Sequence, residues 1–264
     1  MPGALMLALP FYLLGNISLE NIFWVFAFAW FLTRFYRSAS AYLLFFFAYI
    51  LCSTVALQDL ITGGDYLINT LYVAISMYGV VLVYQKPTGR GIRILAVIFY
   101  AITLCSRPIF VLATLPVISA SILQKEGKRS LAAFLTLNTL VALIIVGPFY
   151  FYDPSHFTPL QTPASYLRWA PPALHVKILL SCATLFVAAA SFFRRLEVIS
   201  IFGWVALAFA AMFIPYCFMV AAVQGWTVPI FLHQWTYSLP ATIFGGLWLI
   251  RQAEFRANRN EVAR

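Results

Sequence analysis

The chain has 264 residues, of which 63% are hydrophobic and only 9% are charged. So few charged and polar side chains cannot cover the surface of a water-soluble globule of this length, so we expect lipid to be the main solvent of the chain. The formal net charge is +9, but the basic residues form short clusters between apolar runs. That spacing is typical of membrane topology, and it excludes nucleic acid as the expected partner.

The apolar runs also predict the fold class. Inside a bilayer the backbone has to satisfy its own hydrogen bonds, and long runs without alternation favour helices over barrel strands. We therefore expect an all-α protein, a polytopic transmembrane helical bundle of about eight to ten membrane segments. These segments are expected to form a single transmembrane domain over residues 1–264.

In chain order, the candidate membrane segments are 2–15, 17–33, 40–57, 66–84, 94–123, 130–150, 176–193, 198–223 and 228–250. The first is short, because about 20 residues are needed to cross a hydrocarbon core about 30 Å thick. Residues 151–175 are expected to form a polar outer loop, and residues 251–264 a charged tail or juxtamembrane helix.

The basic residues predict the orientation. One alternate set of connections holds Arg34, Arg37, Lys86, Arg90, Arg93, Lys125, Lys128, Arg129, Arg194, Arg195, Arg251, Arg256, Arg259 and Arg264. The other set holds Arg107, Arg168 and Lys177. Because cytoplasmic connections are enriched in Lys and Arg, we expect the larger set and the C-terminus to be cytoplasmic.

Segment 94–123 is expected to be a hairpin broken at Ser106-Arg107-Pro108. A single crossing here would move all the later basic connections to the other side and remove the charge bias. Proline after Arg107 also disfavours a continuous helix. Each arm would have about 14 residues and reach about 21 Å, which predicts that the turn lies below the outer surface, enclosed by protein or water.

Arg107 is the strongest candidate binding residue, because an arginine near membrane depth normally needs an anion, carbonyl groups or water. Its planar guanidinium suits a lipid phosphate. The alternative is structural, with Arg107 reaching the outer interface or pairing with a nearby acid.

Four acids are expected on the outer side: Glu20, Asp59, Asp65 and Asp153. A carboxylate there is suited to act as a general base or to bind a metal, and Asp59 and Asp65 are the catalytic candidates. A divalent metal is therefore left open, and no other cofactor is expected. The alternative is that these acids are solvated or cap helices, since Asp65 ends a Thr62-Gly63-Gly64-Asp65 turn.

His156, Arg168 and His233 are further candidates for binding a sugar or a phosphate on the outer side, although histidines at membrane interfaces often have no such role. Asn69 and Gln224, at the outer ends of their segments, either line a polar cavity or bond to neighbouring helices.

Four sets of residues carry a resemblance to a known family. They are Pro2-Gly3-Ala4-Leu5 through Leu9-Pro10-Phe11; Cys105-Ser106-Arg107-Pro108 with Pro116; Gly147-Pro148-Phe149 through Tyr152-Asp153-Pro154 with Phe157; and Tyr237-Ser238-Leu239-Pro240. With these the chain resembles part of the bacterial GT-C glycosyltransferases, multi-spanning enzymes that use polyprenyl-phosphate sugars at the outer membrane face.

The resemblance implies a bacterial plasma-membrane protein that transfers a hexose or pentose from a polyprenyl-phosphate donor, with Arg107 holding the lipid phosphate. The catalytic aspartate of the family lies in a first outer loop that has no counterpart here. The resemblance thus also implies a truncated or late-start form, whose base is absent or supplied by a partner.

Two other classes stay open. A transporter or flippase of lipid-linked or small solutes would need polar residues at mid-membrane and often internal symmetry, and few such residues and no repeat are visible. A non-catalytic membrane subunit that packs against a protein partner is the other class.

Overall fold

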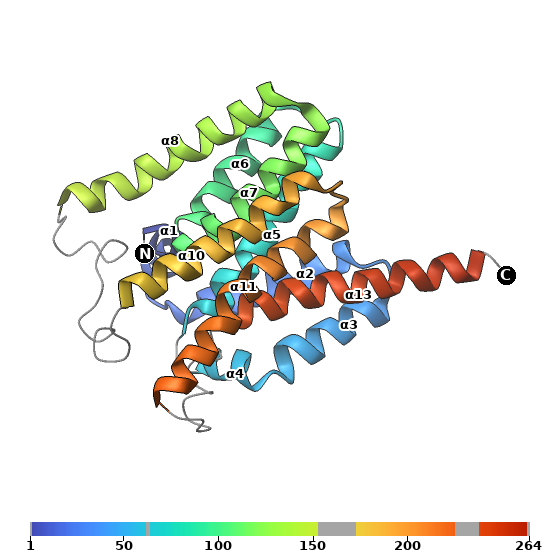
Figure 1. The fold of residues 1–264 in the computed structure, drawn as a ribbon, viewed down its shortest axis with the longest axis horizontal. Helices are drawn as coiled ribbons and strands as arrows, with labels where there is room; N and C mark the ends of the chain where they lie inside the picture. The colour runs from blue at the N-terminus through green and yellow to red at the C-terminus, as the bar shows by residue number, and fades with distance from the viewer. Residues whose placement is uncertain (1, 62–63, 153–172, 225–237, 263–264) are drawn as a thin grey trace.

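The computed structural model describes residues 2–61, 64–152, 173–224 and 238–262, and every secondary-structure element in these ranges is a helix (Figure 1). The helices are α1 (Pro2–Leu13), α2 (Ser18–Phe35), α3 (Ala39–Phe45), η1 (Phe46–Leu51), α4 (Thr54–Ile61), α5 (Tyr66–Gln85), α6 (Arg90–Leu104), α7 (Pro108–Glu126), α8 (Lys128–Tyr152), α10 (Ala173–Ala190), η3 (Ser191–Phe193), α11 (Val198–Gln224) and α13 (Leu239–Val262). The expected all-α class is confirmed.

Helix length and composition make the chain an integral membrane protein. Among the described residues, four helices (α5, α7, α8 and α11) are long and apolar enough to cross a membrane, or up to six if each of two bent pairs counts as one span. The first pair, α1 with α2, is bent by 111°, and the second, α3 and η1 with α4, by 60°. The eight to ten expected segments also include short and broken helices, which this count of full-length spans in the described residues leaves out.

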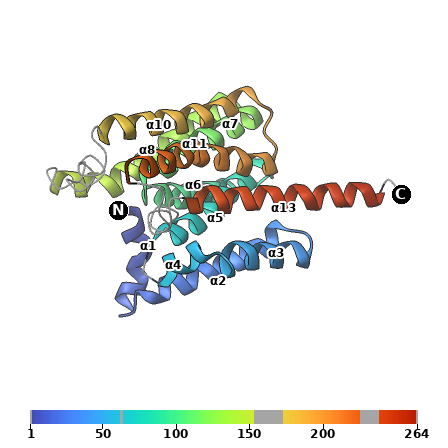
Figure 2. The same ribbon diagram turned by 60° about the horizontal axis from the view of Figure 1, so that its bottom comes forward.

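Two expected segments lie outside the membrane spans. For the tail, the juxtamembrane-helix alternative is confirmed as far as Val262, where α13 ends, and this helix extends past the other helices (Figures 1 and 2). Most of the expected loop 151–175 lies outside the described residues, which resume where α10 begins at Ala173.

The helices form three layers around α5 (Figure 2). Helices α2, α3 and α4 lie on one side, α5, α6 and α13 in the middle, and α7, α10 and α11 on the other side. Most side chains of α5 are buried, including Tyr72 and Met77, which are fully enclosed. One continuous hydrophobic cluster joins all three layers, so they fold as one body.

Two contacts bring basic connections together at one end of the bundle, here called the basic end. Arg93 Nη1, at the start of α6, lies 2.6 Å from Glu126 Oε2, at the end of α7. Gln124 Nε2, also near the end of α7, donates to the carbonyl of Arg194 at 2.7 Å. Because α6 begins where α7 ends, the expected hairpin is confirmed. Its arms have 15 and 19 residues, so α7 is a full-length span.

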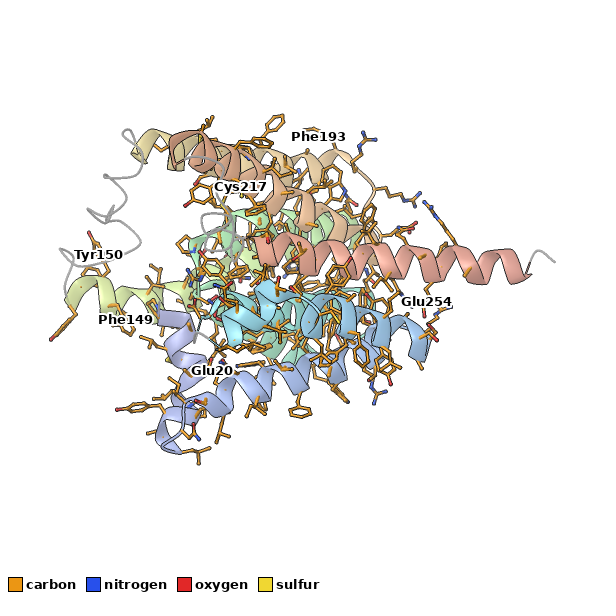
Figure 3. All side chains as sticks on the ribbon, turned by 90° about the horizontal axis from the view of Figure 1, so that it is seen from below. Glu20, Phe149, Tyr150, Phe193, Cys217 and Glu254 are labelled. Atoms are coloured by element: carbon orange, nitrogen blue, oxygen red, sulfur yellow. The ribbon has the colours of Figure 1, made fainter. Side chains whose placement is uncertain are left out.

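A buried carboxylate fastens α13 to the connection between α2 and α3, also at the basic end. Glu254 accepts hydrogen bonds from Arg37 N at 2.8 Å and from Ser38 N at 2.6 Å, and it pairs with Arg251. The Glu254 side chain, labelled beside α13 in Figure 3, is only 7% exposed. Burial raises the pKa of this carboxyl, but the bonds from Ser38 N, Arg251 and Arg37 N outweigh burial and hold the pKa below its ordinary value of 4.5.

Glu254→Gln is expected to remove an acid-sensitive part of the stability. Because the folded pKa lies below the unfolded value, the ionised carboxylate stabilises the fold fully above pH 4.5, and this contribution is lost as pH falls through the folded pKa. The unfolding temperature of detergent-solubilised protein should therefore fall more steeply in acid for the wild type than for the variant.

The matched control is Glu197→Gln, which changes an exposed acid at the same end of the molecule. It should keep the wild-type pH profile. An unchanged profile in Glu254→Gln would show that this carboxylate does not stabilise the native fold.

Candidate functional site at the break between α6 and α7

Arg107 lies in the break between two helices, and local sequence explains the break. Pro108 occupies the first turn of α7 and disfavours helical geometry at the residue before it, so Arg107 is extended, with φ −156° and ψ 136°. Ser106 Oγ donates to the Thr103 carbonyl at 2.6 Å at the end of α6. The carbonyl of Arg107 in turn accepts from Phe110 N at 3.1 Å in the first turn of α7.

The beginning of α1 packs directly on this break. Gly3 N donates to the carbonyl of Cys105 at 3.2 Å. A Cβ at Gly3 would lie 2.6 Å from Cys105 C and 2.7 Å from Ser106 N, and closer still to the carbonyl oxygen of Ile102. Only glycine allows this approach of two backbones. Sequence analysis noted Gly3 within the first motif but did not predict this contact.

The guanidinium of Arg107 lies against the N-terminal end of α5. It forms an ion pair with Asp65, the residue just before α5, and its carbon lies 3.8 Å from the centroid of the Tyr66 ring. The Arg107 side chain is 21% exposed and that of Asp65 is 51% exposed. The structure therefore brings together a binding candidate and a catalytic candidate, with the carboxylate on the more accessible side.

Two buried polar residues of α5 continue from Asp65 into the core. Asn69 Nδ2 donates to Asp65 Oδ2 at 3.2 Å, and the hydroxyl of Tyr72 donates to Asn69 Oδ1. These bonds of Asn69 stay within α5 and the residue before it, so they match neither the expected polar cavity nor the expected bond to a neighbouring helix. Tyr72 was missed by sequence analysis, although its position three residues after Asn69 places both on one helix face.

Asp59, the other catalytic candidate, caps α5 from the preceding helix. Its Oδ2 accepts from Leu67 N at 2.8 Å, and its carbonyl accepts from Gly64 N at 2.7 Å. The residue is buried, and a Cβ at Gly64 would collide with its carboxylate. This geometry favours the helix-capping alternative for Asp59. Asp65 precedes α5, yet its carboxylate makes no capping bond there.

Glu20, labelled in Figure 3, lies in the first turn of α2 and is the third acid in this region, close enough for its charge to be affected by that of Asp65. Within the described ranges, no three His, Cys, Asp or Glu side chains are grouped so as to hold a metal ion. Asp153, His156, Arg168 and His233 lie outside the described residues, as does the side chain of Gln224.

The level of the site along the bundle follows from α5. Its 20 residues rise about 30 Å, which matches the hydrocarbon core. Arg107 pairs with the residue just before this helix, so the pair lies at one end of a full-length span. We call this end of the bundle the Arg107 end.

No known family model, curated protein or solved structure matches the chain.

Proposed function

We propose that the chain is a GT-C-like membrane glycosyltransferase that takes its sugar from a polyprenyl phosphate at the Arg107 end. The observation that carries the proposal is an accessible carboxylate, Asp65, bonded to an arginine at the boundary end of a spanning helix. This pair offers a base and an anion-binding group side by side. The resemblance of the Cys105-Ser106-Arg107-Pro108 stretch to the broken helices of that family supports the same assignment.

In the proposed reaction, the carboxylate of Asp65 accepts the proton of an acceptor hydroxyl while the acceptor oxygen forms a bond to C1 of the sugar. The bond from C1 to the phosphate oxygen breaks, and its electron pair leaves with the polyprenyl phosphate. Arg107 stabilises the charge on that phosphate. A guanidinium carries five N–H donors in a planar fork, so one arginine is able to contact a carboxylate and a phosphate together.

The same proposal places the protein in a bacterial plasma membrane, with the basic end and the C-terminus in the cytoplasm. The excess of Lys and Arg at the basic end supports this orientation. The Arg107 end would then face outward, where polyprenyl-phosphate sugars are presented to acceptors.

The test uses purified protein with a panel of radiolabelled polyprenyl-phosphate hexoses and pentoses, and a cell-envelope extract as acceptor. Wild-type protein should transfer label and bind polyprenyl phosphate saturably. Asp65→Asn should abolish transfer and keep binding, whereas Arg107→Lys should weaken binding by about tenfold, because an ammonium cannot reproduce the fork of a guanidinium. A parallel reaction with EDTA tests the divalent metal.

Arg34→Lys is the matched control, because Arg34 lies at the opposite end of α2, beside Trp30. It should leave both readouts unchanged. Wild-type protein that neither transfers label nor binds polyprenyl phosphate would overturn the proposal.

A non-catalytic membrane subunit is the second candidate. It is favoured by the fact that Arg107 and Asp65 already neutralise each other, as a purely structural pair would. In that case the chain should co-purify in mild detergent with a protein partner, and transfer activity should follow the partner.

A further inference from the structure

Five cations at the basic end, on two different turns, form one surface. Lys125, Lys128 and Arg129 lie where α7 passes into α8, and Arg194 and Arg195 follow η3; all five are exposed. This set is called the two-turn basic surface below.

A neutral side chain ties the two turns together. Gln124 Nε2 donates to the carbonyl of Arg194 at 2.7 Å, and Gln124 Oε1 accepts from Leu196 N at 3.0 Å. Both polar atoms of the Gln124 side-chain amide therefore form hydrogen bonds with backbone groups on either side of Arg195. The bonds hold the second pair of cations beside the end of α7, so the five charges form one surface fixed by the fold.

The surface has little negative charge to neutralise it. Glu126, the acid within the first turn, is already engaged by Arg93 at 2.6 Å and by Ser130 Oγ at 2.9 Å. Glu197 is the acid nearest in sequence to the second turn. Within the described residues, none of the five cations forms an ion pair. Such a concentration of one sign attracts an anionic partner.

The surroundings of the surface indicate which anion. Phe192 and Phe193 directly precede Arg194, and Phe193 is 89% exposed; Figure 3 shows it at the edge of the molecule. Lys125, Lys128 and Arg129 stand at the ends of α7 and α8, both of which are long and apolar enough to span a membrane. Exposed aromatic rings beside basic residues at the end of a span are placed to meet acyl chains and head groups at once.

We propose that the two-turn basic surface is a binding site for the head groups of anionic phospholipids in the membrane leaflet at the basic end. The lipid phosphate would contact cations from both turns, while the acyl chains lie along the apolar side chains of α8 and the exposed phenylalanines. The site is independent of the chemistry at the Arg107 end.

The test measures the affinity of detergent-solubilised full-length protein for dioctanoyl phosphatidylglycerol, with dioctanoyl phosphatidylcholine as the zwitterionic comparison. The variants are Lys128→Gln/Arg129→Gln and Arg194→Gln/Arg195→Gln. Since each basic residue near an anionic surface contributes roughly 1 kcal/mol, or about fivefold, each double variant should weaken phosphatidylglycerol binding by about 25-fold. Binding of phosphatidylcholine should not change.

Two further variants distinguish a specific site on the two-turn basic surface from general attraction of anionic lipid to positive charge. Arg34→Gln/Arg37→Gln removes two exposed cations from the same end of the bundle, but from the last turn of α2 and the connection that follows it, and it should alter the affinity less than about twofold. Gln124→Ala removes no charge, but it removes the two hydrogen bonds between the turns. It should weaken phosphatidylglycerol binding measurably.

Equal losses in all three double variants would show diffuse attraction and overturn the proposal. A loss in only one of the two test variants, or no loss in either, would overturn it as well. Unchanged circular dichroism and elution volume would show that each variant is folded.

Discussion

Gly3→Ala is expected to destabilise the protein by about 2 kcal/mol or more, because it inserts a methyl group between two backbones. The new Cβ would lie 2.6 Å from Cys105 C and 2.7 Å from Ser106 N. Backbone atoms cannot rotate away as a flexible side chain does, so α1 must move off the break between α6 and α7. The hydrogen bond from Gly3 N to Cys105 would be lost with it.

The measurement is the unfolding temperature in detergent, together with the affinity for polyprenyl phosphate. Both should fall in Gly3→Ala, since Arg107 directly follows Cys105 and Ser106, the residues on which α1 packs. Gly91→Ala, in α6, is the matched control, because nothing lies within 4 Å of its Cβ. If Gly3→Ala were as stable as Gly91→Ala, α1 would not be packed on the break.

The second large effect is expected from the ion pair of Asp65 and Arg107. Removing either partner leaves a partly buried charge without its counter-ion, so Arg107→Gln and Asp65→Asn should each cost about 1 to 3 kcal/mol of unfolding free energy. The double variant should cost about as much as the more harmful single change, because the two residues interact directly.

Wild type, the two single variants and the double variant form a double-mutant cycle. Chemical unfolding of these four proteins gives the coupling energy between Asp65 and Arg107. Additive losses would mean that the pair contributes nothing to the fold, and the orientation of Asp65 would need another explanation. Arg93→Gln with Glu126→Gln provides a comparison double-mutant cycle at the basic end, where the acid of the ion pair is less exposed, at 23% against 51% for Asp65.

The helical class and the break at Arg107 were predictable from sequence because they depend on local properties. Composition selects helices, and the proline after Arg107 stops one helix and starts the next. The charge bias then required the hairpin, which the pair of Arg93 with Glu126 confirms.

The partners in the site could not be predicted, because they are distant in sequence. Arg107 and Asp65 are separated by 42 positions, and the pair forms only because α5 lies beside the break. Sequence analysis expected Asp65 to begin a helix, and it does precede α5, but the capping carboxylate comes from Asp59 in another helix. Composition carries no signal that distinguishes these two aspartates.

The length of the second hairpin arm could not be predicted from hydropathy. The sequence predicted two arms of about 14 residues, whereas α6 has 15 residues and α7 has 19. The extra turn of α7 includes charged residues at its end, which hydropathy alone had assigned to the connection.

The measurement that tests the topology most directly is labelling of single cysteines in intact cells with a membrane-impermeant thiol reagent. Asn16→Cys lies in the exposed turn between α1 and α2, near the Arg107 end, and Lys128→Cys lies at the basic end; both are made after Cys52, Cys105, Cys182 and Cys217 are replaced. We expect Asn16→Cys to be labelled in intact cells and Lys128→Cys only after the membrane is permeabilised. Labelling of Lys128→Cys in intact cells would place the basic end outside and contradict the proposed site.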